Sequence, residues 1–289
     1  MDLRQLRYFM AVAEEGQITA AARRLRISQP PLSHELARLE NELGTQLVRR
    51  GPRGVTLTEA GRLLYERGTR ILEMTSAAEH EVSSVGRGLT GTLRLACCPS
   101  TAGLAPGPRL QELAARFPDV RLDVREGDVP EVIELVTGGI AEIGVVRTPF
   151  PSQGLRCRYA PAEPLVAVMP PALERGGELE VSLAELGGSP IVCDRRTAES
   201  LLAAPGAREG SLAVSCLAQD CRTVCSCAAG GLGVGLVPRS LLTVCDTGDC
   251  FIKTVTEKNL ETRAAVIWKA DRTLSPLAER AVALLGELC

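Results

Sequence analysis

Residues 28–44 read S-Q-P-P-L-S-H-E-L-A-R-L-E-N-E-L-G, and this stretch decides how the N-terminal part of the chain folds. Four leucines recur at helical spacing and form one narrow apolar stripe: Leu32, Leu36, Leu39 and Leu43. Small and polar side chains occupy the opposite face. Ser28 can cap the first turn, where the two prolines are tolerated, and Gly44 can end the helix. The stretch therefore predicts a short helix with one packed face and one free face, which suits the DNA major groove.

Two short helices are predicted immediately before this stretch. Apolar residues at helical spacing give the first helix an inward face, and Gly16 ends it. Thr19 is expected to cap the second helix. Only Ile27 and Ser28 then separate the second helix from the third, which is the connectivity of a helix-turn-helix.

After Gly44, the segment 48–57 reads V-R-R-G-P-R-G-V-T-L. A Gly/Pro/Arg tip between two short β-prone runs predicts a hairpin, or wing. Three arginines of this wing are expected to contact the phosphate backbone: Arg49, Arg50 and Arg53. The alternative is an ordinary solvated hairpin, because Arg is also a common surface residue.

A long helix is predicted over residues 58–85. Its apolar positions lie seven residues apart, as in the seam of a coiled coil: Leu64, Ile71, Ala78 and Val85. A helix of this length cannot bury such a stripe alone, so we expect it to pair two subunits. The alternative is that this helix belongs to the core of the following domain. The glycines between residues 86 and 91 argue against that alternative, because they indicate a flexible junction between the helix and the domain.

Composition bounds the class of protein. The chain has 289 residues and a formal net charge of −2, so any basic surface for nucleic acid must be local. We find no secretory leader and no apolar run of membrane-spanning length, which predicts a cytoplasmic protein. Its eleven cysteines should then be mostly reduced thiols.

The chain has only two histidines, His34 and His80. A Ser-His-Asp triad and a histidine-rich metal site are therefore excluded after residue 80. We expect no cofactor and no catalytic residues.

From residue 92 the pattern changes to alternating strands and helices, as in parallel sheets covered by helices. The predicted strands cover residues 92–97, 120–124, 143–146, 165–168, 191–193, 213–216, 233–237 and 263–268. The predicted helices cover residues 106–117, 129–136, 183–186, 198–203, 222–229 and 275–288. Two such α/β lobes would place a ligand in a cleft at the carboxyl ends of their strands.

Three stretches form a specific signature: L-R-Q-L-R-Y-F-M-A-V-A-E-E-G, T-A-A-A-R-R-L-R-I-S-Q-P-P-L-S, and L-E-N-E-L-G-T-Q-L-V-R-R followed by L-T-E-A-G-R-L-L. With them the chain resembles the LysR-type transcriptional regulators, more loosely also through E-I-G-V-V-R and A-A-G-G-L-G-V-G-L-V-P-R-S. The resemblance implies a winged helix-turn-helix at 1–58, a linker helix at 59–88 and a two-lobed α/β, periplasmic-binding-protein-like effector domain at 89–289. Lobe I would take about residues 89–161 and 268–289, and lobe II about residues 162–267. It also implies promoter DNA and a small-molecule effector as partners of a homodimer or homotetramer.

By position, the resemblance assigns DNA contacts to Gln29, Pro30, Ser33 and His34, to which we add Arg38 and the three wing arginines. Most similar proteins carry Arg where this chain has His34. Histidine has a shorter reach and titrates near neutrality, so we expect a weaker, pH-dependent contact at this position.

The candidate effector site begins at the turn after the first strand of the effector domain. The hydroxyls of Ser100 and Thr101 can converge with free helix amides on an anion, and Arg147 can supply a charge-assisted partner. Thr197 of the second lobe would face the same cleft, and Asp128 lies where similar proteins often bind effector through Ser or Thr. The hydroxyls and Arg147 predict a small, polar and anionic metabolite, whereas the acidic Asp128 would repel a carboxylate, so the sequence leaves the charge of the ligand open. The alternative for Ser100 and Thr101 is that they only cap a helix.

Two further patterns allow other functions. Cysteines gather at positions 216–250, which would suit a thiol redox switch or a metal site, although core packing is the ordinary role of such residues. The run G-G-L-G-V-G at 230–235 lacks the spacing and the strand-before-helix order of a nucleotide-binding loop. A solute-binding protein or an enzyme on the same two-lobed fold is the remaining alternative.

Overall fold

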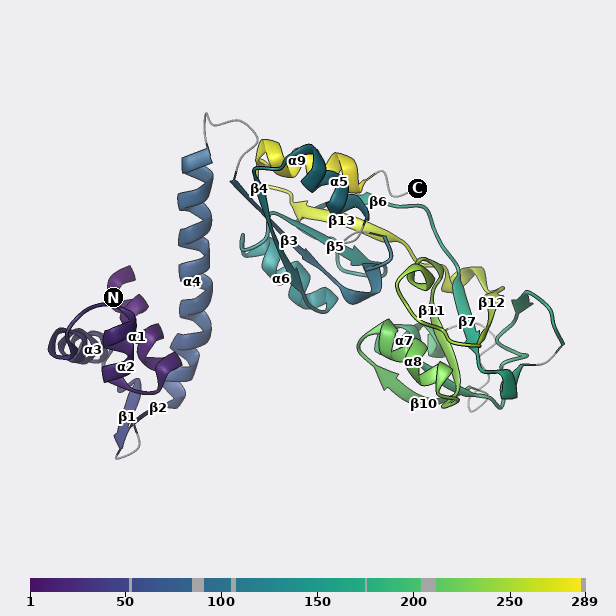
Figure 1. The fold of residues 1–289 in the computed structure, drawn as a ribbon, viewed down its shortest axis with the longest axis horizontal. Coiled ribbons are helices and arrows are strands. Elements are labelled where there is room, and N and C mark those ends of the chain that lie inside the picture. Colours follow the sequence, from purple (N-terminus) through teal and green to yellow (C-terminus); the bar gives the residue numbers. More distant parts are fainter. Residues whose placement is uncertain (52–53, 85–90, 105–107, 175, 204–211, 287–289) are drawn as a thin grey trace. The chain divides into compact units, whose positions relative to one another are not determined.

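The computed structural model describes residues 1–51, 54–84, 91–104, 108–174, 176–203 and 212–286 (Figure 1). It divides into two compact units, Met1–Ser83 and Ser84–Cys289. The first unit contains α1 (Leu3–Glu15), α2 (Ile18–Arg24), α3 (Gln29–Leu43), β1 (Val48–Gly51), β2 (Gly54–Leu57) and α4 (Glu59–Ser84). This order confirms the predicted helix-turn-helix and hairpin.

Local sequence signals set both ends of α1, but the side-chain caps predicted at the starts of α2 and α3 are not seen. A capping box between Asp2 and Gln5 starts α1, and Gly16 ends it with a left-handed φ of 63°. Ser28 lies at the N-cap of α3, but its side chain makes no capping hydrogen bond. The predicted cap at Thr19 is wrong, because α2 begins one residue earlier and Thr19 lies inside it.

The core of the first unit forms around the leucine stripe of α3. Leu32, Leu36 and Leu39 are almost completely buried and pack against Leu6 and Phe9 of α1. The fourth leucine of the stripe, Leu43, remains 41% exposed at the end of the helix. The same side chains that fix α3 against its neighbours leave its opposite face free.

The long helix α4 packs as part of the first unit, which argues against a core helix of the following domain. Leu64 lies against the helical core, whereas Ile71 and Met74 are 36% and 51% exposed. Ala78 is also exposed, and Val85 lies outside the described residues. Among the described residues, the seam positions Ile71 and Ala78, with Met74 beside them, are therefore exposed.

The first sheet of the second unit has the strand order β4-β3-β5-β13-β6. Its parallel strands are β3 (Gly91–Cys97), β4 (Val120–Glu126) and β5 (Ile143–Arg147), and β13 (Ala264–Lys269) and β6 (Leu155–Tyr159) extend it antiparallel. Apolar side chains of α5 (Pro108–Arg116) and α9 (Pro276–Leu285) pack on one face of the sheet. Those of α6 (Val129–Thr137) pack on the other.

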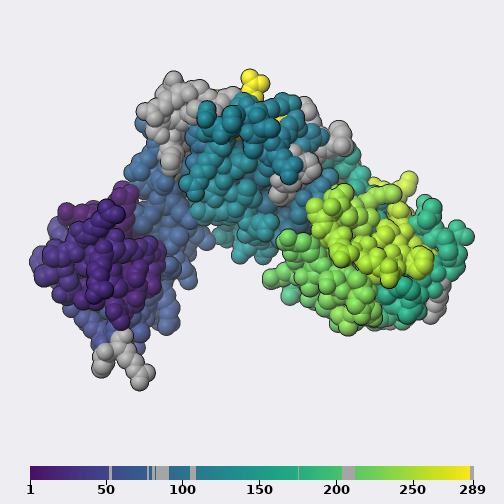
Figure 2. Space-filling model, in the orientation of Figure 1, coloured from purple at the N-terminus to yellow at the C-terminus, as the bar shows by residue number. Residues whose placement is uncertain are grey.

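The second sheet has the order β10-β9-β11-β7-β12-β8. Its strands are β7 (Leu165–Met169), β8 (Glu180–Val181), β9 (Pro190–Asp194), β10 (Ala213–Ala218), β11 (Val234–Pro238) and β12 (Phe251–Val255). One face packs against α7 (Arg195–Ala203) and the other against α8 (Cys221–Ala229). The two sheets form the two lobes, which Figure 2 shows as separate rounded masses within the second unit.

The structure corrects several expectations for the second unit. The predicted helix at 183–186 is a series of turns. Strands β6, β8 and β12 were not predicted. The strand β13 belongs to the first sheet from Ala264 onward, so the chain returns to lobe I a few residues before the predicted boundary at 268.

Candidate functional site

The free face of α3 presents the residues predicted to read DNA. The exposed residues of this set are Gln29, Pro30, His34 and Arg38. Ser33 is half-buried, and its hydroxyl oxygen accepts a hydrogen bond from the side-chain nitrogen of Gln29 at 3.3 Å. Arg38 forms a weak surface ion pair of 3.7 Å with Glu35, which salt and a competing phosphate can displace. Polar donors therefore line the exposed surface of α3.

The hairpin of β1 and β2 presents its arginines to solvent. Val48 is buried at the start of β1, and the following Arg49 and Arg50 are exposed. The strands pair antiparallel from Val48 opposite Leu57 to Gly51 opposite Gly54. Arg53, the third predicted wing contact, lies outside the described residues.

Two chain segments cross between the lobes of the second unit, and they pair with each other. The amide of Glu163 donates to the carbonyl of Thr262, and the amide of Thr262 donates to the carbonyl of Glu163, both at 2.9 Å. Thr262 also donates its hydroxyl to the carbonyl of Thr148 at 3.0 Å. The junction between the lobes is thus an ordered antiparallel bridge.

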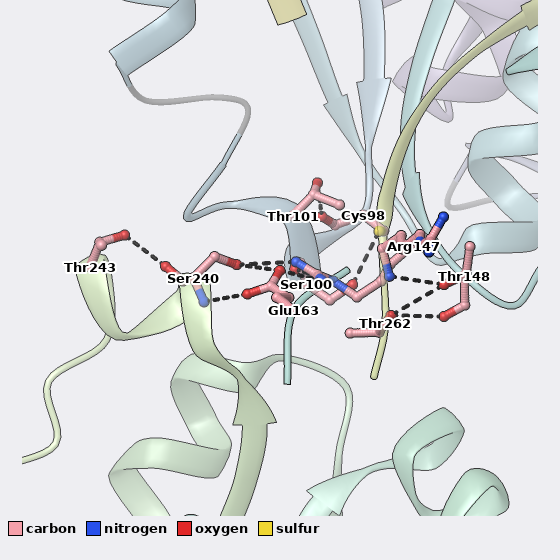
Figure 3. Close-up of polar contacts among 10 residues, drawn as sticks. Cys98, Ser100, Thr101, Arg147, Thr148, Glu163, Ser240, Thr243 and Thr262 are labelled. Atoms are coloured by element: carbon pink, nitrogen blue, oxygen red, sulfur yellow. Dashed lines mark hydrogen bonds and ion pairs between the residues drawn. The ribbon is translucent and has the colours of Figure 1, made fainter. Parts of the chain in front are cut away.

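Arg147 ends β5 and points its side chain into this junction, where only 5% of the side chain is exposed (Figure 3). Its Nε donates to the carbonyl of Ser100 at 2.9 Å and its Nη1 to Oε1 of Glu163 at 2.6 Å. Its Nη2 donates to Oγ of Ser240, in lobe II, at 3.2 Å. All three guanidinium nitrogens therefore have partners within the chain.

Glu163 completes the arrangement by holding Ser240 through both carboxylate oxygens. The amide of Ser240 donates to Oε2 at 2.6 Å and its hydroxyl donates to Oε1 at 2.9 Å. We call Arg147, Glu163 and Ser240 the interlobe clasp. A buried ion pair needs such additional hydrogen bonds to offset its desolvation, and here they join both lobes.

Close backbone packing accompanies the clasp. Gly103 of lobe I approaches lobe II so closely that a Cβ on it would lie 2.1 Å from the carbonyl oxygen of Ser240. Further along the junction, the guanidinium of Arg196, in α7, donates to the carbonyl of Pro149. The carboxyl ends of β5 and β9, which precede Pro149 and Arg196, therefore meet at the junction.

The predicted effector residues have mixed roles in the structure. Thr101 is fully buried and donates its hydroxyl to the carbonyl of Cys98 at 2.7 Å. Asp128 caps α6 by accepting the amide of Glu131 at 2.9 Å. The amide of the buried Thr197 donates to the carboxylate of Asp194 at 2.8 Å. These three residues support their own local structure.

Ser100 and Arg147 are brought together, but not as predicted. The half-buried hydroxyl of Ser100 lies 3.2 Å from the Cys98 sulfur, while its carbonyl binds Arg147. Because Glu163 already neutralises Arg147, the prediction of Arg147 as a free partner for an anion is wrong for this conformation. Glu163 and Ser240 were not predicted, because an isolated Glu and an isolated Ser carry no spacing signal.

The cysteines behave as packing residues. Burial raises the pKa of Cys97, Cys193 and Cys225 to about 12, opposite to the lowered pKa of a reactive thiol. The ten cysteines in the described part of the chain are free thiols. Within that part, no group of three or more potential ligands is arranged to hold a metal ion.

Comparison with known proteins agrees with this architecture. Residues 3–62 match the bacterial regulatory helix-turn-helix proteins of the lysR family, and residues 86–289 match the LysR substrate binding domain. The HTH-type transcriptional regulator BudR of Raoultella terrigena is 33% identical over 93% of this chain and 95% of its own length. The regulator IlvR of Caulobacter vibrioides is 32% identical over 96% of this chain and 95% of its own length.

A solved structure shows the same fold over the full length. The crystal structure of CbnR, a LysR family transcriptional regulator, matches with a TM-score of 0.80 at 22% identity, covering 99% of this chain and 98% of CbnR. The buried stripe and free face of α3, the exposed wing and the two α/β lobes are all accounted for by one family. The chain belongs to the LysR family of DNA-binding transcriptional regulators, with an N-terminal helix-turn-helix and a C-terminal effector-binding domain.

Proposed function

We propose that the chain binds promoter DNA by placing α3 in the major groove and the wing against the phosphate backbone. The observation that carries this proposal is the free face of α3, where Pro30, Ser33 and His34 lie away from the buried leucines and Gln29 is exposed in the first turn. Arg38, Arg49 and Arg50 add exposed positive charge on the same unit. Arg53 lies outside the described residues and is proposed as a phosphate contact from its place in the sequence alone. A solved structure of full-length CbnR with its target DNA has a TM-score of 0.80 to this chain.

Fluorescence anisotropy with duplexes tiled across the DNA adjoining its own gene tests the DNA contacts. Gln29→Ala should reduce the preference for the best duplex over a random one, because its side chain faces base edges. Arg49→Ala should weaken both complexes alike and reduce the slope of log affinity against log salt by about 1. Binding that Gln29→Ala and Arg49→Ala leave unchanged would contradict the assignment.

For the effector, we infer a small polar molecule that binds where the strand ends of the two lobes meet. Ser100 presents a half-buried hydroxyl beside this junction, and Arg196 reaches across it from α7. Because Arg147 is bound to Glu163, the charge-assisted contact to an anionic effector falls to Arg196 in this proposal. The family match to a substrate-binding domain supports an effector in this part of the chain.

Calorimetry with a panel of small carboxylic acids and their amides tests the site and the charge of the effector. We expect a carboxylate to bind, Ser100→Ala and Arg196→Ala to weaken it, and Arg121→Ala to leave it unchanged. Arg121 is a suitable control because it is an exposed arginine near the amino end of β4. Equal binding of acids and amides, or unchanged binding by Arg196→Ala, would exclude the anionic assignment.

We further propose that two copies of the chain pair through α4. Ile71, Met74 and Val82 expose large apolar side chains along this helix, with Val82 75% exposed. Covering them in a second copy would bury the seam that one chain leaves open. Sedimentation should show a dimer or tetramer that Ile71→Asp dissociates, and an unchanged mass in that variant would rule out this seam.

A regulator of promoter DNA acts where the bacterial chromosome lies, so we propose a cytoplasmic protein. Among the helices of the described residues, none combines the length and the apolar character needed to cross a membrane. The relatives that match over nearly the whole chain are regulators, and we propose that this chain has no enzymatic activity.

A further inference from the structure

Glu40 joins the two elements proposed to contact DNA. It lies near the end of α3, on the helix that carries the reading residues. Its Oε1 accepts hydrogen bonds from the amide of Leu47 at 2.8 Å and from the amide of Val48 at 3.1 Å. Leu47 immediately precedes β1 and Val48 begins it, and the same strand carries Arg49 and Arg50. One carboxylate oxygen of α3 therefore holds the base of the wing.

The hydrogen bonds of Glu40 lie at a buried place in the first unit. Leu47 is 1% exposed and Val48 is 5% exposed, so water is largely excluded around their backbone. Buried amides need an acceptor, and a charged acceptor forms stronger bonds than a neutral one. Removing the carboxylate leaves two amides without this acceptor, and the start of β1 then keeps only apolar packing against the leucines of α3.

Other contacts fix the wing to different helices. The amide of Val55 in β2 donates to the carbonyl of Gly16, the end of α1, at 2.7 Å. Thr58 donates its hydroxyl to the carbonyl of Gln46 at 2.7 Å and its amide to the carbonyl of Leu47 at 3.0 Å, just before α4 begins. These three bonds keep the hairpin in the fold when Glu40 is changed, but none of them comes from α3.

We propose that Glu40 is a positioning residue that sets the placement of the wing arginines relative to the reading face of α3. The proposal rests on the DNA contacts proposed above. A DNA duplex presents bases and phosphates at fixed separations. If the wing moves relative to α3, the protein can therefore keep the base contacts of α3 only by losing phosphate contacts of the wing arginines, or the reverse. Glu40 thus affects phosphate contacts that its own side chain does not make.

A double-mutant cycle tests this role. Affinity for the tightest-binding duplex from the DNA adjoining its own gene is measured for Glu40→Ala, for Arg49→Ala/Arg50→Ala and for their combination, over a range of salt. We expect Glu40→Ala to weaken binding roughly tenfold and to flatten the salt slope, because phosphate contacts are lost. In the variant without the two arginines, Glu40→Ala should change affinity by less than about twofold.

Two variants separate positioning from charge and from misfolding. Removing a negative charge alone favours DNA binding, and Glu42→Ala, on the same helix with an exposed side chain, measures that effect. Glu40→Gln keeps a carbonyl oxygen that accepts both amides and should bind nearly as wild type. If Glu40→Ala does not fold by circular dichroism, the cycle is run with Glu40→Asp, which keeps the charge but withdraws the oxygen by one methylene.

The outcomes distinguish this inference from the proposed function. Coupling between Glu40 and the wing arginines, with rescue by Glu40→Gln, supports the positioning role. An equal loss with and without the arginines, or no loss at all, overturns it while the DNA-binding function stands. A wild-type protein that does not distinguish its best duplex from a random one overturns the proposed function and this inference together.

Discussion

Replacing Glu163 with alanine should destabilise the second unit more than any substitution at an exposed carboxylate. The change removes the acceptor of three hydrogen bonds, one from Arg147 and two from Ser240. It leaves Arg147, whose side chain is 5% exposed, without its counter-ion. Breaking a buried pair in this way costs about 3–5 kcal/mol, and we expect the lower end because Arg147 keeps its bonds to Ser100 and Ser240.

Urea unfolding followed by tryptophan fluorescence measures this loss without interference from the first unit. Trp268 is the single tryptophan of the chain, and it lies in β13 of lobe I. With an m-value of about 2–3 kcal/mol/M, a loss of about 3 kcal/mol lowers the midpoint by about 1–1.5 M. Glu163→Gln keeps an acceptor but loses the charge, so its midpoint should fall between those of wild type and Glu163→Ala.

The matched control is Glu261→Ala, in the other crossing segment. Glu261 is exposed, and surface substitutions of this kind usually change stability by less than about 0.5 kcal/mol. If Glu163→Ala unfolds at the same urea concentration as Glu261→Ala, the clasp does not stabilise the lobes and the reasoning is refuted.

Three further predictions follow from single residues. His34→Arg should tighten DNA binding and steepen the salt slope by up to about 1 in anisotropy titrations, and an unchanged slope would remove position 34 from the contact set. Gly103→Ala should cost about 1–3 kcal/mol in urea unfolding, because the new methyl would meet the Ser240 carbonyl at 2.1 Å; Gly230→Ala, with nearest atoms at 3.4 Å, is the control, and equal losses would contradict this. Burial raises the pKa of Cys193 from 9.0 to about 12, so its contribution to stability is complete below pH 9 and is lost as the pH rises toward 12. Cys193→Ala should therefore reduce the fall in unfolding free energy between pH 9 and 11 by up to about 1.4 kcal/mol per pH unit, and an identical fall in both proteins would show that the thiol does not titrate as proposed.

Local patterns predicted the elements that carry their own signal. The leucine stripe of α3 and the left-handed Gly44 after it determine that helix from short-range information alone. The strand β12 was missed for the opposite reason, since its F-I-K-T-V sequence places Lys253 inside an apolar run. Lys253 is 4% exposed and lies 2.7 Å from Glu174, a partner that only the fold brings near.

In the candidate effector site, too, local sequence predicted the position of one residue but not the partners that the fold brings to it. Arg147 was correctly placed at the end of a strand, where a functional charge is often found. Its partners Glu163 and Ser240 lie 16 and 93 residues further along the chain. Sequence reasoning therefore predicts an anionic ligand as the partner of Arg147, whereas in the structure that partner is the carboxylate of Glu163. The position of a charged residue was therefore predictable from sequence, whereas its counter-ion depends on the tertiary packing of both lobes.

Nuclease footprinting of the wild-type protein on the DNA adjoining its own gene tests the central claim most directly. If a pair of α3 helices reads DNA from one oligomer, protection should cover two half-sites on one side of the duplex, with centres separated by about 10 base pairs or a multiple of it. The protection should persist when random competitor DNA is added. Protection that has no preferred position and disappears with random competitor would contradict a sequence-specific regulator.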